Sequence, residues 1–297
     1  MLNNSESVAV VILNYNTYQD TIRLVRELQR QSVAQQLRIV VVDNASPNGS
    51  YEQIKPLEQE FANVVVLKTE KNLGYAQGNN FGLKYLEQNT PPKYVAILNN
   101  DVSLEDDCLE RLAKRYEELE RPAVIAPIMV DSMGEQQVMM NGLPSVWEDF
   151  MSLSAIYQKL HNSKRLTLCD NTGDKAMRVE VIGGSFMFTQ MERFRQMGYF
   201  YPGTFLYIEE RFVAEAAKRL QLYNYVILDQ TYIHAHNSPS INSEYDKVSK
   251  YRMLYRSRRE YIRVCKRHGR LKAAILRPFM WLSLMEWRVI GWIKRVL

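Results

Sequence analysis

The stretch KYVAILNNDVSLEDD, residues 93–107, decides how the chain is read. Residues 94–98 are an apolar run of strand length, so we expect a buried strand there. The run ends at Asn99-Asn100-Asp101, and Ser103 with Asp106 has the spacing of a capping box that starts a helix. Ligands bind at the carboxyl ends of strands in open α/β sheets. The stretch therefore predicts a functional carboxylate, Asp101, at a sheet edge.

The same order of apolar strand, polar break and helix runs through the first half of the chain. Thr17 with Asp20 is a second capping box, Pro56 limits its helix to a short or kinked piece, and residues 74–86 have helical spacing. Strands that are apolar on both faces and alternate with helices indicate an α/β fold. We expect a mostly parallel central sheet with helices on both faces. The expected strands are residues 8–13, 39–42, 64–67, 94–98, 123–127, 179–182 and 225–228.

Composition sets limits on the class of protein. The chain has 297 residues, of which 46% are apolar and 24% charged, as in ordinary globular proteins. The three cysteines lie far apart, which excludes a zinc spacing or a disulfide framework and fits a reducing compartment. The N-terminus has no basic region before its first apolar run, so we expect no secretory signal.

The net charge is divided unevenly along the chain. Residues 247–297 hold fifteen Lys or Arg against two acidic residues, which gives +13. The net charge is +5, so the remaining residues carry −8. We therefore expect a folded body, residues 1–245, and a basic helical tail, residues 246–297, that seeks an anionic partner.

Polar clusters end several of the expected strands. They are Asn14 to Asn16, Asp43 to Ser46, Asn72 to Asn80 and Asn99 to Asp101. A single cluster is explained by turn formation, since Asn, Asp and Ser are common turn residues. Parallel strands, however, direct their carboxyl ends to one edge. The convergence of several clusters there predicts a binding site.

These motifs together resemble the family-2 glycosyltransferases, which have the GT-A fold. The matching text is VVILNYNTYQDTIRLVREL, IVVVDNASPNGS, EKNLGYAQGNNFGL, YVAILNNDV and FLYIEERF, in the family's order. The form LNNDV and the later acid pair look most like the rhamnosyltransferase-type branch. The resemblance implies a nucleotide-sugar-binding half, about residues 1–127, and an acceptor-binding half, residues 128–245.

The resemblance also implies roles for single residues in the donor pocket. Asp43 matches the aspartate that contacts the nucleotide base. The other positions that match the nucleotide-sugar pocket are Asn14, Asn16, Asn72, Gly74, Asn79, Asn99 and Asn100.

Asn99-Asn100-Asp101 matches the DxD element of the family, in which the last aspartate helps to hold a divalent metal, Mg²⁺ or Mn²⁺, on the diphosphate. A hard cation there neutralises the charge that the leaving group gathers. Asn99 replaces the first acid, so we expect a further protein ligand. His234 in YIHAHNSPS is the candidate, with His236 two residues later. The alternative for either histidine is a hydrogen-bonded residue near the surface.

The acid pair in LYIEERF is the expected catalytic group. Inverting transfer requires a carboxylate that takes the proton of the acceptor hydroxyl. The resemblance aligns the base with the second member, Glu210, and Glu209 is the runner-up. Two glutamates that open a helix are otherwise a surface matched to the helix dipole. Gly183, Gly184 and Ser185 resemble the family's small-residue turn at the acceptor site, and the alternative is an ordinary tight turn.

The basic tail predicts membrane association. On a helical projection Trp281, Met285, Val289, Trp292 and Val296 share one face, and Arg288, Lys294 and Arg295 lie on the other side. Glu286 and Arg288 interrupt the segment, so a helix lying in the interface of an anionic membrane is expected rather than one that spans it. The alternative is a helix packed on the protein's own core or on a partner subunit.

The sequence thus predicts a metal-dependent, inverting glycosyltransferase at the inner, cytoplasmic face of the cell membrane. It would move a sugar, rhamnose in the branch named above, from a nucleotide-diphosphate donor to a lipid-linked or polysaccharide acceptor. A sugar-phosphate nucleotidyltransferase is the first alternative, but the chain lacks a Gly-rich N-terminal loop with a following Arg and Lys. A nucleic-acid-binding protein is the second. The acidic body and the tryptophan face argue against nucleic acid as a partner.

Overall fold

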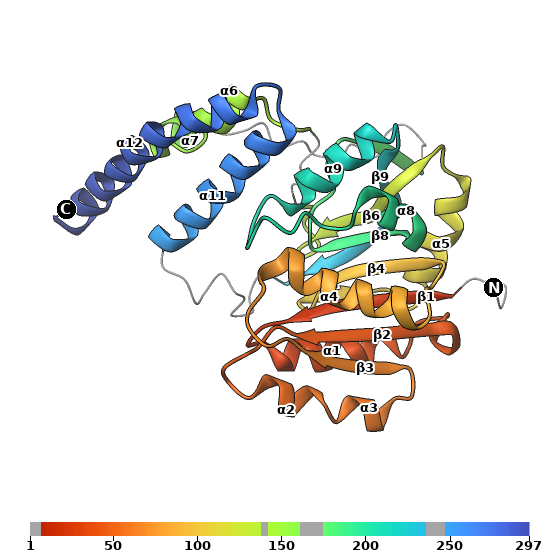
Figure 1. Cartoon of the computed structure of the whole chain (residues 1–297). Helices are drawn as coiled ribbons and strands as arrows, with labels where there is room; N and C mark the ends of the chain where they lie inside the picture. Colours follow the sequence, from red (N-terminus) through yellow and green to blue (C-terminus); the bar gives the residue numbers. More distant parts are fainter. Residues whose placement is uncertain (1–6, 138–141, 161–174, 236–246, 297) are drawn as a thin grey trace.

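One sheet runs through the body of the molecule and takes strands from both halves of the chain (Figure 1). The computed structural model describes residues 7–137, 142–160, 175–235 and 247–296, without the side chains of 158–160, 247 and 291–296. The described strands follow the order β3-β2-β1-β4-β8-β6-β9-β5, and β7 pairs with β9. They are β1 (Val8–Asn14), β2 (Leu37–Asp43), β3 (Val64–Lys68), β4 (Tyr94–Asn99), β5 (Val102–Leu104), β6 (Pro122–Val130), β7 (Ala176–Val179), β8 (Phe186–Gln190) and β9 (Tyr223–His234).

The first half of the sheet is parallel, as the alternation of strands and helices predicted. β1 lies between β2 and β4 and is parallel to both, and β2 is parallel to β3. Every residue of β1 is buried, which explains its unbroken apolar run. Asn14 lies opposite Asp43, and Leu13 lies opposite Asn99. The polar ends of three strands therefore meet at one edge, which confirms the expected convergence.

The second half of the sheet is mixed. β8 is antiparallel to both β4 and β6, β6 is parallel to β9, and β5 and β7 are antiparallel to β9. β9 is twelve residues long, well beyond the short strand expected at 225–228. The strand expected at 179–182 ends instead at Val179, because only residues 176–179 pair with β9. The sheet thus combines a parallel first half with a mixed second half.

Two expected capping boxes are wrong. Ser103 lies within β5, because Val102 and Leu104 alternate with it and are buried against the sheet. The following helix begins at Cys108, with Asp107 at its N-cap. Thr17 does occupy the N-cap of the first helix, but its side chain makes no cap hydrogen bond there. It accepts a hydrogen bond from Asn100 instead.

Helices cover both faces of the sheet, as expected. Alternate residues of β1 face opposite cores: Val10 belongs to the core that also holds residues of α1, α2, α3 and α5, and Val11 belongs to the core that holds residues of α4, α8 and α9. Pro56 separates α2 from α3, which confirms the expected interruption. These helices and one 3₁₀ turn are α1 (Tyr18–Leu28), η1 (Ala34–Gln36), α2 (Ser50–Ile54), α3 (Leu57–Glu60), α4 (Gly74–Asn89), α5 (Cys108–Glu118), α8 (Met191–Met197) and α9 (Glu209–Arg219).

The C-terminal residues form two long helices beside the sheet (Figure 1). They are α11 (Lys247–Cys265) and α12 (Gly269–Val296), and they pack with α6 (Val146–Met151) and α7 (Ala155–Leu160). Ile262 and Leu276 are fully buried in a third core, which also holds Phe212 of α9. The C-terminal helices therefore share a core with the body of the protein.

Candidate active site

Asp43 is the centre of a buried hydrogen-bond cluster at the ends of β1 and β2. Its Oδ1 accepts from Asn14 Nδ2 at 2.8 Å and from Ser46 Oγ at 2.7 Å, and its Oδ2 accepts from the Ser46 amide at 3.1 Å. The Ser46 hydroxyl in turn accepts from the amide of Asn16. Asp43 and Asn14 are both fully buried. The carboxylate therefore fixes the two loops that follow β1 and β2.

Asn44 is a second centre that the sequence analysis did not single out. It is fully buried, its Nδ2 donates to Asn72 Oδ1 at 3.0 Å, and its Oδ1 accepts from the Leu73 amide at 2.9 Å. Asn72 Oδ1 also accepts from the Gly74 amide. The end of β2 is thus tied to the start of α4. The one sequence feature that pointed to Asn44 was its position next to Asp43 in the polar cluster at the end of the strand.

Two further asparagines predicted for the donor pocket, Asn100 and Asn79, donate hydrogen bonds to neighbouring residues of the protein. Asn100 is directed toward α1, where its amide donates to the hydroxyls of Thr17 and Thr21 at 2.6 and 2.9 Å. Asn79 is fully buried on α4, and its amide donates to the carbonyl of Tyr75. Both amides hold helices in place at this edge.

Asp101 and His234 come together from distant parts of the chain. Asp101 lies in the turn between β4 and β5, and His234 is the last residue of β9. His234 pairs with Val102 across the sheet, which brings its Nε2 to 3.1 Å from Asp101 Oδ1. Their exposed fractions are only 7% and 9%. The structure therefore brings together the two residues that the sequence analysis selected as metal ligands.

This pair suits part of a Mg²⁺ or Mn²⁺ shell. Neighbouring ligand atoms of an octahedral Mg²⁺ lie about 3 Å apart, since each bond is about 2.1 Å long. The Asp101–His234 separation matches that spacing. No group of three or more His, Cys, Asp or Glu suited to a metal occurs in the described part of the chain. Further ligands would have to come from the diphosphate and from water. His236 lies outside the described residues.

A cavity of about 490 Å³ opens beside this pair. Asn99 and His234 line it, and so do Gly183, Gly184 and Ser185. Tyr75, Tyr207, Glu209, Glu210, Arg211, Tyr232, Leu254 and Arg258 are among the other lining residues. The cavity thus joins residues predicted for the donor, the metal, the acceptor and the base.

The acid pair opens α9 after a strained turn. Tyr207 and Ile208 have φ values of 73° and 76°, a left-handed conformation that a β-branched residue such as Ile208 rarely adopts. Glu209 is buried, and burial together with the charge of Glu210 raises its pKa to about 8. Glu210 is partly exposed, and desolvation raises its pKa above the ordinary value, a rise that its own backbone amide and Arg211 offset only in part. At neutral pH Glu209 therefore holds a proton.

Gly74 connects the donor side to the loop that precedes the acid pair. Its φ is +75°, and a Cβ atom there would lie 2.1 Å from the carbonyl oxygen of Phe205. The next residue, Tyr75, donates its amide to that same oxygen at 2.8 Å and its hydroxyl to the carbonyl of Gly184. The start of α4 therefore holds both the acid loop and the small-residue turn.

The small-residue turn does not depend on glycine for its backbone. Neither Gly183 nor Gly184 has a positive φ, and a Cβ on Gly183 would meet nothing within 4 Å among the described atoms. Ser185 is buried, and its hydroxyl lies 2.7 Å from that of Tyr232. Open space beside Gly183 leaves room for a ligand at this wall of the cavity, whereas a Cβ on Gly184 would lie 3.8 Å from Tyr75 Oη.

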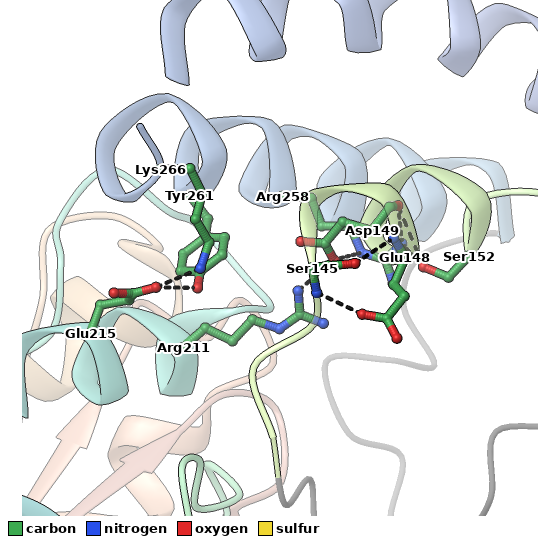
Figure 2. A network of polar contacts seen from close by, with 9 residues as sticks. All are labelled: Ser145, Glu148, Asp149, Ser152, Arg211, Glu215, Arg258, Tyr261 and Lys266. Atoms are coloured by element: carbon green, nitrogen blue, oxygen red, sulfur yellow. Dashed lines mark hydrogen bonds and ion pairs between the residues drawn. The ribbon is translucent and has the colours of Figure 1, made fainter. Parts of the chain in front are cut away.

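Arg211 and Arg258 form a charged cluster with Asp149 (Figure 2). Arg211 Nη1 lies 2.6 Å from Asp149 Oδ1, and Arg258 Nε lies 3.9 Å from the same oxygen. Arg258 Nη1 also donates to Ser152 Oγ at 2.8 Å. The sequence analysis missed all three residues as site residues, because nothing marks Arg258 among the many basic residues of the tail.

An exposed apolar face runs along α12. Ser283 and Leu284 are buried on the inner side, and Ser283 Oγ donates to the carbonyl of Leu153. The residues exposed along the outer side are Leu271, Ile275, Trp281, Leu282, Met285 and Val289. The side chains of Trp292, Lys294, Arg295 and Val296 lie outside the described residues. Within the described helices, none has a stretch long and apolar enough to cross a membrane.

The chain matches a known family model and one curated relative. The model of Glycosyl transferase family 2 matches residues 9–183, which is more than half of the chain. The "Glycosyltransferase GlyG" of Streptococcus pneumoniae serotype 4 (strain ATCC BAA-334 / TIGR4) is 27% identical over 121 residues. That match spans 41% of this chain and 38% of the relative.

Solved structures confirm the GT-A-like α/β fold. GalNAc-T7 with UDP, GalNAc and Mn²⁺ matches 87% of this chain with a TM-score of 0.61 and 13% identity. TarS 1-349 of S. aureus in complex with UDP-GlcNAc matches 92% of this chain with a TM-score of 0.57 and 16% identity. These matches cover 48% and 71% of the two solved chains.

Proposed function

Because the chain belongs to glycosyl transferase family 2, we propose that it transfers a sugar from a nucleotide-diphosphate donor to an acceptor hydroxyl, with inversion. One observation carries this proposal. A single cavity is lined by Asn99 and His234 and also by Glu209 and Glu210. A donor held at Asn99 and His234 would have its anomeric carbon in the same cavity as the acid pair.

Glu210 is the proposed base. It is partly exposed to the cavity, whereas Glu209 is buried and has a pKa of about 8. The Glu210 carboxylate would take the proton of the acceptor hydroxyl as the new C–O bond forms and the nucleoside diphosphate leaves. Protonated Glu209 beside it keeps the second charge out of the site.

Asp101 and His234 are the residues that would hold a divalent cation, Mg²⁺ or Mn²⁺. Such a cation, when bound, supplies positive charge that stabilises the diphosphate. GalNAc-T7 was solved with UDP, GalNAc and Mn²⁺. UDP together with Mn²⁺ is therefore the first combination to test for binding here. The Asp101–His234 contact and the adjoining cavity support the assignment.

The donor pocket is proposed at the ends of β1, β2 and the start of α4. Asp43 and Asn44 are buried and bonded to neighbouring loops, so they would shape the pocket through the Asn14–Asn16 and Asn72–Gly74 segments. The TarS structure holds UDP-GlcNAc, and the motif LNNDV resembles the rhamnosyltransferase-type branch. Nucleotide-activated rhamnose and UDP-GlcNAc are therefore the donors to compare first.

The acceptor is proposed to be a lipid-linked or polysaccharide intermediate at the inner face of an anionic membrane. The exposed apolar face of α12 supports this, since an interfacial helix buries such a face at headgroup depth. Arg270, Arg277 and Arg288 are exposed and follow the border of that face. Their charges would attract anionic lipid.

A thermal-shift screen tests the central proposal. The purified chain is heated with nucleoside diphosphates and sugar nucleotides, each with and without Mn²⁺. We expect one base and one sugar class to raise the Tm, and more so with Mn²⁺, because a ligand that binds only the folded state stabilises it. A flat response to the whole panel, with and without metal, would refute a nucleotide-sugar site.

A further inference from the structure

We propose that Arg211 and Arg258 form an anion-binding subsite of the cavity, and that this subsite holds a phosphate group of the acceptor. The inference rests on the proposed function, since it assigns the chemistry of the acceptor in the same cavity. Both arginines line that cavity together with Glu209 and Glu210. Figure 2 shows how they converge from α9 and α11 on Asp149 of α6.

The cluster of Asp149, Arg211 and Arg258 holds two positive charges and one negative charge, and the charge of Arg211 also acts on the neighbouring Glu210. Asp149 is 1% exposed and forms a close ion pair with Arg211, whose side chain is 6% exposed. That pair is already neutral. Arg258 adds a second guanidinium, 11% exposed and 3.9 Å from the same carboxylate oxygen. A buried charge without a partner is costly, so an anion in the cavity would offset it.

The two guanidiniums also keep unused donors. Arg258 Nη1 donates hydrogen bonds to the Ser152 hydroxyl and to the backbone carbonyl of Asp149. The Nε atoms of Arg211 and Arg258 are buried and have no hydrogen-bond partner among the described residues. A phosphate has enough charged oxygens to accept hydrogen bonds from two guanidinium groups, whereas a carboxylate is paired fully by one guanidinium. Two guanidinium groups with free donors therefore favour phosphate over carboxylate.

The subsite adjoins the proposed base, because Arg211 directly follows Glu210 on α9 and both line the cavity, and this places the subsite beside the acceptor. α11 is held on α9 through Glu215, which accepts from Tyr261 Oη and Lys266 Nζ, each at 2.7 Å (Figure 2). α9 packs against β9, in the half of the sheet away from β1 and β2. The Asp43 and Asn44 clusters lie at that other half. An anion at Arg258 is therefore separated from the Asp43 and Asn44 clusters, whereas His234, the proposed ligand on the diphosphate side, is itself on β9 and lines the same cavity.

The experiment fills the donor site first and then offers a phosphate. The protein is saturated with Mn²⁺ and the nucleoside diphosphate that binds it most tightly, and sn-glycerol 3-phosphate is titrated by calorimetry. We expect one site in the wild type. Arg258→Gln should weaken binding at least tenfold, while Asp149 keeps its Arg211 partner. Arg258→Lys should weaken binding less, because it keeps the charge but loses the fork.

Arg256→Gln is the matched control, since Arg256 lies two residues away on α11 and is exposed. Its affinity for sn-glycerol 3-phosphate should equal that of the wild type. Absence of binding to the saturated wild type would overturn the inference, even if Arg258→Gln failed to fold. Equal binding by wild type and Arg258→Gln, or equal binding of acetate, would overturn it too.

Two further arms complete the design. The first arm compares polyprenyl phosphate in neutral vesicles with soluble sn-glycerol 3-phosphate. This comparison distinguishes a phosphate on a lipid from one on a soluble glycan. Binding of either probe that depends on Arg258 supports the subsite. If no nucleoside diphosphate binds at all, the proposed function fails. If one binds and neither phosphate probe does, only the present inference fails.

Discussion

His234 Nε2 lies 3.1 Å from Asp101 Oδ1, although 133 positions separate the two residues in the chain. The register of β5 and β9 sets this distance, because His234 pairs with Val102, the residue after Asp101. The backbone adds a second tie, since the amide of Ala235 donates to the carbonyl of Asp101 at 3.0 Å. Sheet pairing therefore holds the two proposed metal ligands at a fixed spacing before any ligand arrives.

Replacing Asp101 with Asn should remove metal-dependent nucleotide binding. The amide keeps the shape of the side chain but loses the charge that a hard cation prefers. We expect the Mn²⁺-dependent part of the affinity for a nucleoside diphosphate to disappear in calorimetry. Asp106→Asn, at an exposed acid in the following turn, is the control. Unchanged metal dependence in Asp101→Asn would remove Asp101 from the site.

The two glutamates should separate in kinetics. Glu210→Gln removes the proposed base, so transfer should fall by about 10²–10⁴-fold while nucleotide binding persists. Glu209→Gln resembles the protonated form that Glu209 already has at neutral pH, so its loss of transfer should be much smaller. Single-turnover assays with the donor found by the screen would measure both. An active Glu210→Gln beside an inactive Glu209→Gln would reverse the assignment.

The raised pKa of Glu209 predicts a pH dependence of stability. Between pH 4.5 and about 8 the folded chain holds a proton on Glu209 that the unfolded chain has released. Stability should therefore fall as the pH rises through this window, by up to about 1.4 kcal/mol per pH unit, and level off above it. Glu209→Gln should lose this component. Urea denaturation of both proteins at pH 5 and pH 8 measures the difference, and parallel curves would show that Glu209 is not buried as a neutral acid.

Local patterns in the sequence predicted the parallel half of the sheet. The apolar run at residues 8–13 and the helix at 74–86 are written in neighbouring residues, and the structure has β1 and α4 there. Ser103 was misread because the spacing of a capping box also fits a short strand, V-S-L. The pairing of that strand with β9 involves residues about 130 positions away, which no local pattern records.

The acid pair and the metal pair were selected from the sequence through the resemblance of their motifs to the family-2 glycosyltransferases, and their roles stay predictions. The cluster at Arg258 could not be selected in this way. Arg258 resembles Arg256 and Arg259 in every local respect, and only the packing of α11 on α9 turns it toward the cavity. The buried roles of Asp43 and Asn44 likewise depend on loops that meet only in the folded chain.

The outer face of α12 should bind anionic vesicles. Trp281, Leu282 and Met285 are exposed there, so charged substitutions should leave the fold intact. We expect Leu282→Glu with Met285→Glu to reduce co-sedimentation with anionic vesicles several-fold. Leu220→Glu, at an exposed apolar residue on the end of α9, is the control. If the wild type ignores vesicles of every composition, the membrane proposal fails.

Point substitutions are preferable to a truncation at Trp281. Glu286 Oε1 accepts from Ser154 Oγ at 3.0 Å and from the Ile156 amide at 2.7 Å. Removing this part of α12 would uncover α7 and the turn before it. Loss of vesicle binding by the truncated chain would then not distinguish a lost lipid contact from a damaged fold.

The last prediction concerns the balance of charge in the cluster of Asp149, Arg211 and Arg258. Asp149→Asn would leave two guanidiniums without a compensating carboxylate in the cluster. Removing one partner of a buried ion pair costs about 3–5 kcal/mol, so the free energy of unfolding should fall by about that amount. Adding Arg258→Gln to Asp149→Asn removes one of the two cations. The double variant should therefore be more stable than the sum of the two single changes predicts, by roughly 0.5–3 kcal/mol. Urea denaturation of the wild type, both single variants and the double variant measures this coupling, with Asp106→Asn as the exposed control. Additive effects would mean that the charge of Asp149 does not act on Arg258. The proposal of surplus positive charge at the cavity wall would then be rejected.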